Sequence, residues 1–402
     1  MEKETKYKKG IQKHLYFSGE LSCAELSELI NKSVPLTSRV LNKMVDEGVV
    51  EELGHALSTG GRRPQMYALK PNLLYMVSVA MDQMITRIAM LDMRNNYVGK
   101  VKSIELVLHD NPDALHQLTQ NLIAFIDASG IPKDKIVGIG IGMPGFVDIE
   151  KGLNYSFLKV PEGESITSTI ESLLGIPVLI DNDSSLIALA ELKLGSARNK
   201  QNVMVINISW GIGLGMILKG TLFNGHNGFA GEFSHIPIFT NNKMCSCGKT
   251  GCLETEASLT IVVEKAIEGL KNGRLSMLKD LSTDHMEEAS IAILDAAAKG
   301  DKFAVELISK TAYNIGRGVA ILIHLLNPEL IVLSGKGSVA GKIWETPIQQ
   351  AINEHCIPKI SDNTKIEISQ LGYEAELIGA AALVMEHFDS TETIDAKSHQ
   401  KL

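Results

Sequence analysis

Three of the chain's five cysteines lie within eight positions, in the segment HIPIFTNNKMCSCGKTGCLE. Their spacing from the histidine that opens it is His235-x9-Cys245-x-Cys247-x4-Cys252. Thiolates and an imidazole are the ligands that Zn2+ prefers, and four protein ligands make a closed, structural tetrahedral site. The segment is rich in Gly, Lys and Asn and could not bury a core, so a metal ion would hold it in place. The spacing predicts a zinc site, and unligated surface thiols are the alternative.

Carboxylates around this segment indicate a second kind of chemistry. Asp181 and Asp183 end an apolar strand pattern, IPVLIDND, where ligands of open α/β sheets collect. Glu232 and Glu254 flank the cysteines. Because each carboxylate accepts two hydrogen bonds, a group of them suits the vicinal hydroxyls of an uncharged polyol such as a sugar. The metal loop would hold His235 and Glu254 beside that pocket. The alternative for Asp183 is a cap on the helix that follows it.

The first 70 residues, called the head below, have a different pattern. Three helical patterns precede two strand patterns, at residues 5–17, 22–30, 33–47, 49–53 and 65–69. Ser22 and Glu25 make a capping box before the second helix. This order predicts a winged helix-turn-helix that binds double-stranded DNA. The residues expected to contact DNA are Thr37, Ser38, Arg39, Asn42 and Lys43 on the third helix and Arg62 and Arg63 on the wing. A solvated helix face with a polar loop is the alternative.

Charge and composition agree with a DNA-binding head on a larger globular body. The head carries 11 Lys or Arg and 9 Asp or Glu, whereas the whole chain carries 39 and 47, a net charge of -8. A mildly basic head on an acidic body suggests that only the head meets a polyanion. No apolar run has the length of a membrane span, and the first residues are too polar for a signal peptide. We therefore expect a cytoplasmic protein without disulfides.

Strand and helix patterns alternate from residue 73 onward, which predicts an α/β fold. The pattern contains two similar units, each of which starts with a β-hairpin meander and continues with helices and strands. At 402 residues the chain is too long for one ordinary core, so we expect two or three domains. The polar stretch after Asp389 is expected to be disordered.

From about residue 10 to 388 the chain resembles the ROK family, named for repressors, open reading frames and kinases of sugars. The most specific stretches are GFAGEFSHIPI, CSCGKTGCLE and GGRRPQMYAL. The resemblance implies a two-lobed, actin-like domain after the winged helix, with Asp183 at the position of the kinases' general base. It implies zinc ligation by His235, Cys245, Cys247 and Cys252, and sugar binding by Asp183, Glu232, His235 and Glu254. The expected boundaries are 1–70 for the head, 71–185 for a first lobe that also receives a helix at about 374–388, 186–373 for a second lobe, and 389–402 for the tail.

Departures from the kinase pattern favour the repressor branch of the family. In the kinases a first-lobe turn of the form Asp-x-Gly-x-Thr binds the ATP phosphates. Here the turn is AMDQM, with Ala80, Asp82 and Met84 at those positions, and an aspartate there would repel phosphate. Ser209 and Trp210 are unusual in the second phosphate loop, and Ser185 replaces an asparagine beside the base.

We therefore expect a homodimeric or homotetrameric repressor that binds an operator and is released by a sugar or sugar phosphate between its lobes, with zinc as a structural ion and without kinase activity. The first alternative is an ATP-dependent sugar kinase with a regulatory DNA-binding head. The second is a repressor whose body is a docking platform for a transporter subunit.

Overall fold

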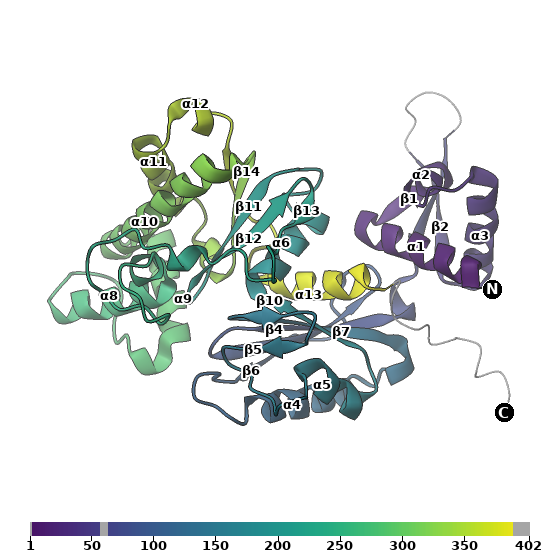
Figure 1. The fold of residues 1–402 in the computed structure, drawn as a ribbon, viewed down its shortest axis with the longest axis horizontal. Coiled ribbons are helices and arrows are strands. Elements are labelled where there is room, and N and C mark those ends of the chain that lie inside the picture. Colours follow the sequence, from purple (N-terminus) through teal and green to yellow (C-terminus); the bar gives the residue numbers. More distant parts are fainter. Residues whose placement is uncertain (1, 57–62, 389–402) are drawn as a thin grey trace. The chain divides into compact units, whose positions relative to one another are not determined.

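The computed structural model describes residues 2–56 and 63–388 (Figure 1). Arg62 and the expected disordered tail lie outside this range. The chain divides into two compact units, of which unit 1 contains Met1–Asp181 and the segment from Ala380 onward, and unit 2 contains Asn182–Gly379. In the part of the chain that the structure describes, no helix combines the length and the apolar character that a membrane crossing requires.

The head consists of three helices and a small antiparallel sheet in the order β1-β3-β2, at the purple end of the chain in Figure 1. Its elements are α1 (Glu2–Ser18), β1 (Glu20–Ser22), α2 (Cys23–Leu29), α3 (Val34–Asp46), β2 (Val50–His55) and β3 (Gln65–Leu69). The Ser22–Glu25 capping box is present, as predicted. Leu26, Leu41 and Met44 are fully buried and tie the helices together. The predicted winged helix-turn-helix is therefore confirmed.

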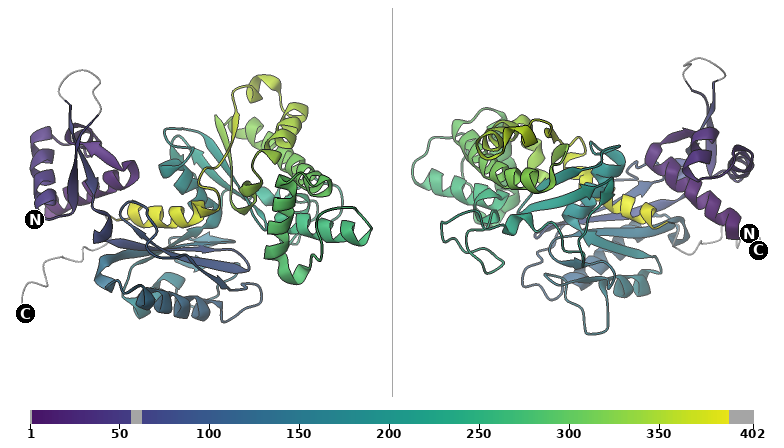
Figure 2. Two further views of the ribbon diagram at one scale, coloured as in Figure 1. Left: turned by 180° about the vertical axis from the view of Figure 1, so that it is seen from behind. Right: turned by 45° about the horizontal axis from the view of Figure 1, so that its top comes forward.

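The remainder of unit 1 is a sheet in the order β10-β7-β4-β5-β6 with helices on both faces (Figure 2). The bounds are η1 (Pro71–Leu73), β4 (Tyr75–Met81), β5 (Ile85–Asp92), β6 (Lys102–Glu105), α4 (Ala114–Ser129), η2 (Lys133–Lys135), β7 (Ile136–Met143), β8 (Val147–Asp148), β9 (Leu153–Asn154), α5 (Ile166–Leu174), β10 (Val178–Asn182) and α13 (Ala375–Glu386), of which unit 1 contains the part from Ala380 onward. Helix α13 crosses the glycines of β7 so closely that a Cβ on Gly140 would lie 2.0 Å from the Ala380 carbonyl oxygen. We call this part, without the head, the first lobe.

Unit 2 has a second sheet, in the order β13-β12-β11-β14-β15. Its strands are β11 (Val203–Ile208), β12 (Ile212–Leu218), β13 (Thr221–Leu222), β14 (Leu330–Ser334) and β15 (Lys365–Ile368). Its helices are α6 (Asp183–Leu194), η3 (Phe233–His235), α7 (Glu254–Ala257), α8 (Leu259–Lys271), η4 (Thr283–His285), α9 (Met286–Ala298), α10 (Lys302–Leu326), η5 (Lys336–Ile343), α11 (Glu345–His355), α12 (Pro358–Ser361) and η6 (Gly372–Glu374). Helix α6 lies on β12, where a Cβ on Gly215 would meet the Ala188 side chain.

The two sheets share one topology. In each, the first strand is central, the next two continue antiparallel on one side, and the last two lie on the other side. Strand β4 pairs antiparallel with β5 and parallel with β7, and β11 pairs in the same way with β12 and β14. This duplicated arrangement is the actin-like fold, so the predicted fold class is confirmed.

Candidate functional site

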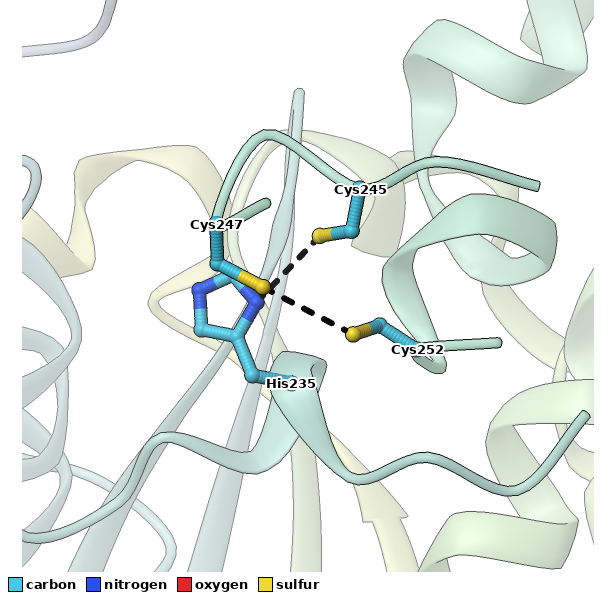
Figure 3. A group of neighbouring side chains, drawn as sticks. All are labelled: His235, Cys245, Cys247 and Cys252. Atoms are coloured by element: carbon cyan, nitrogen blue, oxygen red, sulfur yellow. Dashed lines mark hydrogen bonds between the residues drawn. The ribbon is translucent and has the colours of Figure 1, made fainter. Parts of the chain in front are cut away.

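His235, Cys245, Cys247 and Cys252 form one cluster in unit 2, with one ligand atom from each side chain and all four atoms within 4.8 Å of one another. Figure 3 shows their side chains converging from the end of η3 and from the loop that follows it. The Cys247 and Cys252 sulfurs are 3.7 Å apart, and the Cys245 sulfur is 3.4 Å from Nδ1 of His235. Ligands at the zinc–sulfur distance on a tetrahedron are separated by about 3.8 Å. The cluster could therefore hold a metal ion.

Local hydrogen bonds explain how so polar a loop brings the ligands together. The Cys245 N–H donates to the Lys249 carbonyl over 2.8 Å, and the Gly248 N–H returns to the Cys245 carbonyl over 2.9 Å. Gly251 has a φ of +77°, and a Cβ there would lie 2.1 Å from the Phe239 carbonyl oxygen. Glycine is thus required for this turn, because no other residue has both the conformation and the space.

The thiols of the cluster favour a cation among them. Cys252 is fully buried and Cys245 is 5% exposed. Burial, together with the neighbouring sulfurs of Cys247 and Cys245, raises the pKa of Cys252 to about 12. Three thiolates so close together repel one another, and a divalent cation would remove that repulsion by displacing their protons.

The other ring nitrogen of His235 points toward the acidic residues. Nδ1 faces the sulfurs, while Nε2 is 3.6 Å from a carboxylate oxygen of Glu232. Burial raises the pKa of Glu232, while the charge of His235 lowers it and that of Glu254 raises it. The Ser246 hydroxyl donates to Glu254 over 3.4 Å. A carboxylate on the second nitrogen of a metal-binding histidine fixes the orientation of the ring, so the metal loop and the acidic residues form one arrangement.

Asp183 is the first residue of α6, but the helix is capped by its neighbour. The Asn182 side chain accepts hydrogen bonds from the N–H groups of Ser184 and Ser185, over 2.9 and 3.3 Å. One Asp183 oxygen accepts from the Ser184 N–H over 2.7 Å, and the other accepts from Nδ2 of Asn207 over 3.2 Å. The capping alternative for Asp183 is therefore wrong, because Asn182 has that role.

Asn207 was not expected from the sequence. It lies at the end of β11, only 4% exposed, and its side chain holds Asp183 from the sheet. The same β11–β12 hairpin continues to Gly211, where a Cβ would lie 3.2 Å from Glu254. This hairpin therefore contacts both Asp183 and Glu254. The only signal in the sequence was a single asparagine in the apolar run VMVINI.

Side chains contact both turns that correspond to the phosphate loops of the kinases. In the first lobe the Asp82 carboxylate accepts from the N–H groups of Met84 and Ile85, over 2.8 and 2.7 Å. In unit 2 the ammonium group of Lys336 lies 4.6 Å from the ring of Trp210 and forms an ion pair with Glu287. In the first turn the Asp82 carboxylate thus takes up two backbone N–H groups, the kind of group that binds phosphate.

The predicted DNA-contacting residues do not all lie on one exposed surface. Arg39, Asn42 and Lys43 on α3 are exposed, as is Arg63, and Ser38 is half-buried. Lys43 pairs with Glu4 of α1 at 2.6 Å. The placement of Thr37 on this surface was wrong, because its side chain is fully buried and its hydroxyl donates to the Ser33 carbonyl.

Known proteins resemble this chain over most of its length. A glucokinase of Halalkalibacterium halodurans is 34% identical over 68% of this chain and 85% of its own. A xylose repressor of Caldicellulosiruptor bescii is 28% identical over 91% of this chain and 92% of its own. The crystal structure of a ROK family transcriptional regulator, a homolog of the E. coli MLC protein, matches with a TM-score of 0.74 and 25% identity over 96% of this chain and 98% of that one. The ROK family profile itself matches residues 86–387, and the chain therefore belongs to the ROK family.

Proposed function

We propose that the protein is a cytoplasmic, sugar-responsive transcriptional regulator that represses by binding an operator through its winged helix. The observation that carries this proposal is the head, since an enzyme acting on a free sugar has no need of it. The xylose repressor aligns over 91% of this chain, which must include part of the head, whereas the glucokinase aligns over 68%. The exposed Arg39, Asn42 and Lys43 are side chains of the kinds that contact bases and phosphates from a major groove.

The effector is a carbohydrate or sugar phosphate held by Asp183, Glu232, His235 and Glu254. The fixed carboxylate of Asp183, with Asn207 behind it, would accept hydrogen bonds from vicinal hydroxyls. Zn2+ in the His235–Cys252 cluster would be structural, because four protein ligands leave no open position for chemistry. When bound, it would order the loop that carries His235 and Glu254. Operators with two half-sites suit a homodimer or homotetramer.

A sugar kinase is the second candidate, favoured by the glucokinase relative and by the presence of Asp183. The turn at Asp82 opposes it, because the carboxylate there accepts hydrogen bonds from two backbone N–H groups. Phosphoryl transfer depends mainly on positioning the phosphates and neutralising their charge, and the Asp82 turn would have to open for that. We therefore propose that the chain does not phosphorylate its sugar.

The test measures binding to a duplex from the protein's own promoter region, with and without a panel of sugars and sugar phosphates. We expect one compound to weaken DNA binding by about 5–150-fold, the range of ordinary allosteric coupling. Asp183→Asn should abolish that response while retaining DNA binding. Asp110→Asn is the matched control, because its side chain is 91% exposed. Sugar-dependent ATP turnover that is lost in Asp183→Asn, without any DNA binding, would overturn the proposal in favour of the kinase.

A further inference from the structure

The head contacts the first lobe at a tight turn. This turn, residues 92–96, follows β5 and is organised by Asp92, which is 3% exposed. Its carboxylate accepts from the N–H groups of Arg94 and Asn96, over 2.7 and 3.0 Å. Asn95 has a φ of +59°, a conformation that asparagine tolerates better than most residues. The conformation of the turn is therefore fixed by hydrogen bonds within the lobe, independently of the head.

Arg94 joins this turn to both long strands of the head. Its Nε donates to the carbonyl of Leu69, the last residue of β3, over 2.7 Å. Its Nη2 pairs with Glu51 of β2 at 2.5 Å. Arginine suits this position because its planar group donates in two fixed directions at once, whereas the ammonium of lysine is a single point of charge.

Helix α1 makes a second connection. The Tyr16 hydroxyl, on a side chain that is 3% exposed, donates to Oδ1 of Asn95. Further toward the start of the helix, Lys13 donates to the backbone carbonyl of Glu386 over 2.8 Å and pairs with its carboxylate at 3.0 Å. The head is thus attached to the turn and to the last residue of α13, two separate places in unit 1.

The connecting segment is hydrogen-bonded both to the head and to the lobe. The Lys70 N–H donates to the Val49 carbonyl over 3.0 Å, and the Met93 N–H donates to the Pro71 carbonyl over 3.3 Å. Only residues 70–74 separate β3 from β4. A linker this short, with its hydrogen bonds made, does not let the head swing independently of the lobe.

We propose, building on the proposed function, that the 92–96 turn is a clamp that makes the head and the first lobe one rigid body, and that the sugar response reaches DNA through Arg94. Without the clamp, the head would be a tethered module that binds DNA whether or not the effector is present. The clamp thus determines the ratio of DNA affinities without and with effector, while the affinity of the head itself depends on α3.

The test compares Arg94→Met and Arg94→Lys with wild type. Lys102→Met is the matched control, since Lys102 makes its hydrogen bond inside the lobe, to Asn121 over 3.0 Å. The first measurement is hydrogen exchange of peptides covering residues 69–75, which requires neither effector nor DNA. We expect exchange at least tenfold faster in Arg94→Met, an intermediate effect in Arg94→Lys, and no change in the control. Unchanged exchange in Arg94→Met would overturn the clamp.

The second measurement is the ratio of DNA dissociation constants with and without the sugar found for wild type. We expect Arg94→Met to bind DNA within about threefold of wild type but to lose most of the 5–150-fold sugar response. If Arg94→Met exchanged hydrogen faster but kept the full sugar response, the clamp would exist without transmitting that response to DNA, which would contradict the proposal. A wild-type protein that binds DNA and ignores every sugar overturns the proposed function and transmission with it, while hydrogen exchange still decides the clamp.

Discussion

Replacement of Cys252, a proposed metal ligand of the His235–Cys252 cluster, should lower the melting temperature of unit 2 by an amount that depends on the size of the unit. Cys252 is fully buried, and Cys252→Ser replaces a thiolate ligand by a hydroxyl. A site filled at a hundred times its dissociation constant stabilises the folded chain by about 2.7 kcal/mol. Unit 2 has roughly 200 residues, and for a unit of that size each kcal/mol of unfolding free energy changes the melting temperature by about 2–4 °C. We therefore expect loss of the ion to lower the melting temperature by about 5–11 °C.

Elemental analysis and thermal unfolding with a chelator measure this directly. Wild type should contain about one zinc ion per chain, should melt lower with chelator, and should recover when zinc is returned. Cys252→Ser should melt low from the start and ignore the chelator. Cys23→Ser makes the same chemical change outside the cluster and should behave as wild type. Protein that is purified without zinc and melts at the same temperature with or without chelator would refute the reasoning.

Three further predictions concern a buried acid, a close packing contact and the DNA-binding surface. Burial raises the folded-state pKa of Glu191, so wild type loses stability as the pH rises from the ordinary glutamate value through the folded one. In urea unfolding at pH 4 and 8, the unfolding free energy of Glu191→Gln relative to wild type should therefore be higher at pH 8. A relative unfolding free energy that is the same at both pH values would contradict this. Gly140→Ala should cost about 1–3 kcal/mol of unfolding free energy because its Cβ meets a carbonyl oxygen. The control Gly10→Ala in α1 should instead stabilise the protein by up to about 1 kcal/mol. Equal effects of the two substitutions would disprove the packing argument. Arg39→Ala should reduce the slope of log affinity against log salt by about 0.9, and an unchanged slope would exclude a phosphate contact.

Features determined by neighbouring residues were predictable from the sequence. The capping box at Ser22 starts α2 where expected, and the cysteine spacing brings the cluster together, because in both cases the interacting groups are close along the chain. The burial of Thr37 could also have been found, since Val40, Leu41 and Met44 follow it at the spacing of one helix face. Its hydroxyl made it look like a surface residue, although the Ser33 carbonyl satisfies that group locally.

Features that depend on distant parts of the chain were not predictable. Strand β1 has three residues, and its partner β3 is more than forty positions away, so no periodicity indicates it. Asn207 contacts Asp183 only because β11 ends beside it. Arg94 lies in a turn, and nothing in the sequence distinguishes it from the other charged residues of the chain. Its two partners, Leu69 and Glu51, come from the head and reach it only in the folded structure.

The division of the chain has a consequence for biosynthesis. Helix α13 packs on β7, so the first lobe is completed by residues that are synthesised after unit 2, from Ala380 onward. Unit 2 is continuous and is made entirely in the interval. At 5–20 residues per second, roughly 200 residues take about 10–40 s to translate. Throughout that time the glycine face of β7 in the nascent first lobe is without the helix that covers it in the folded chain.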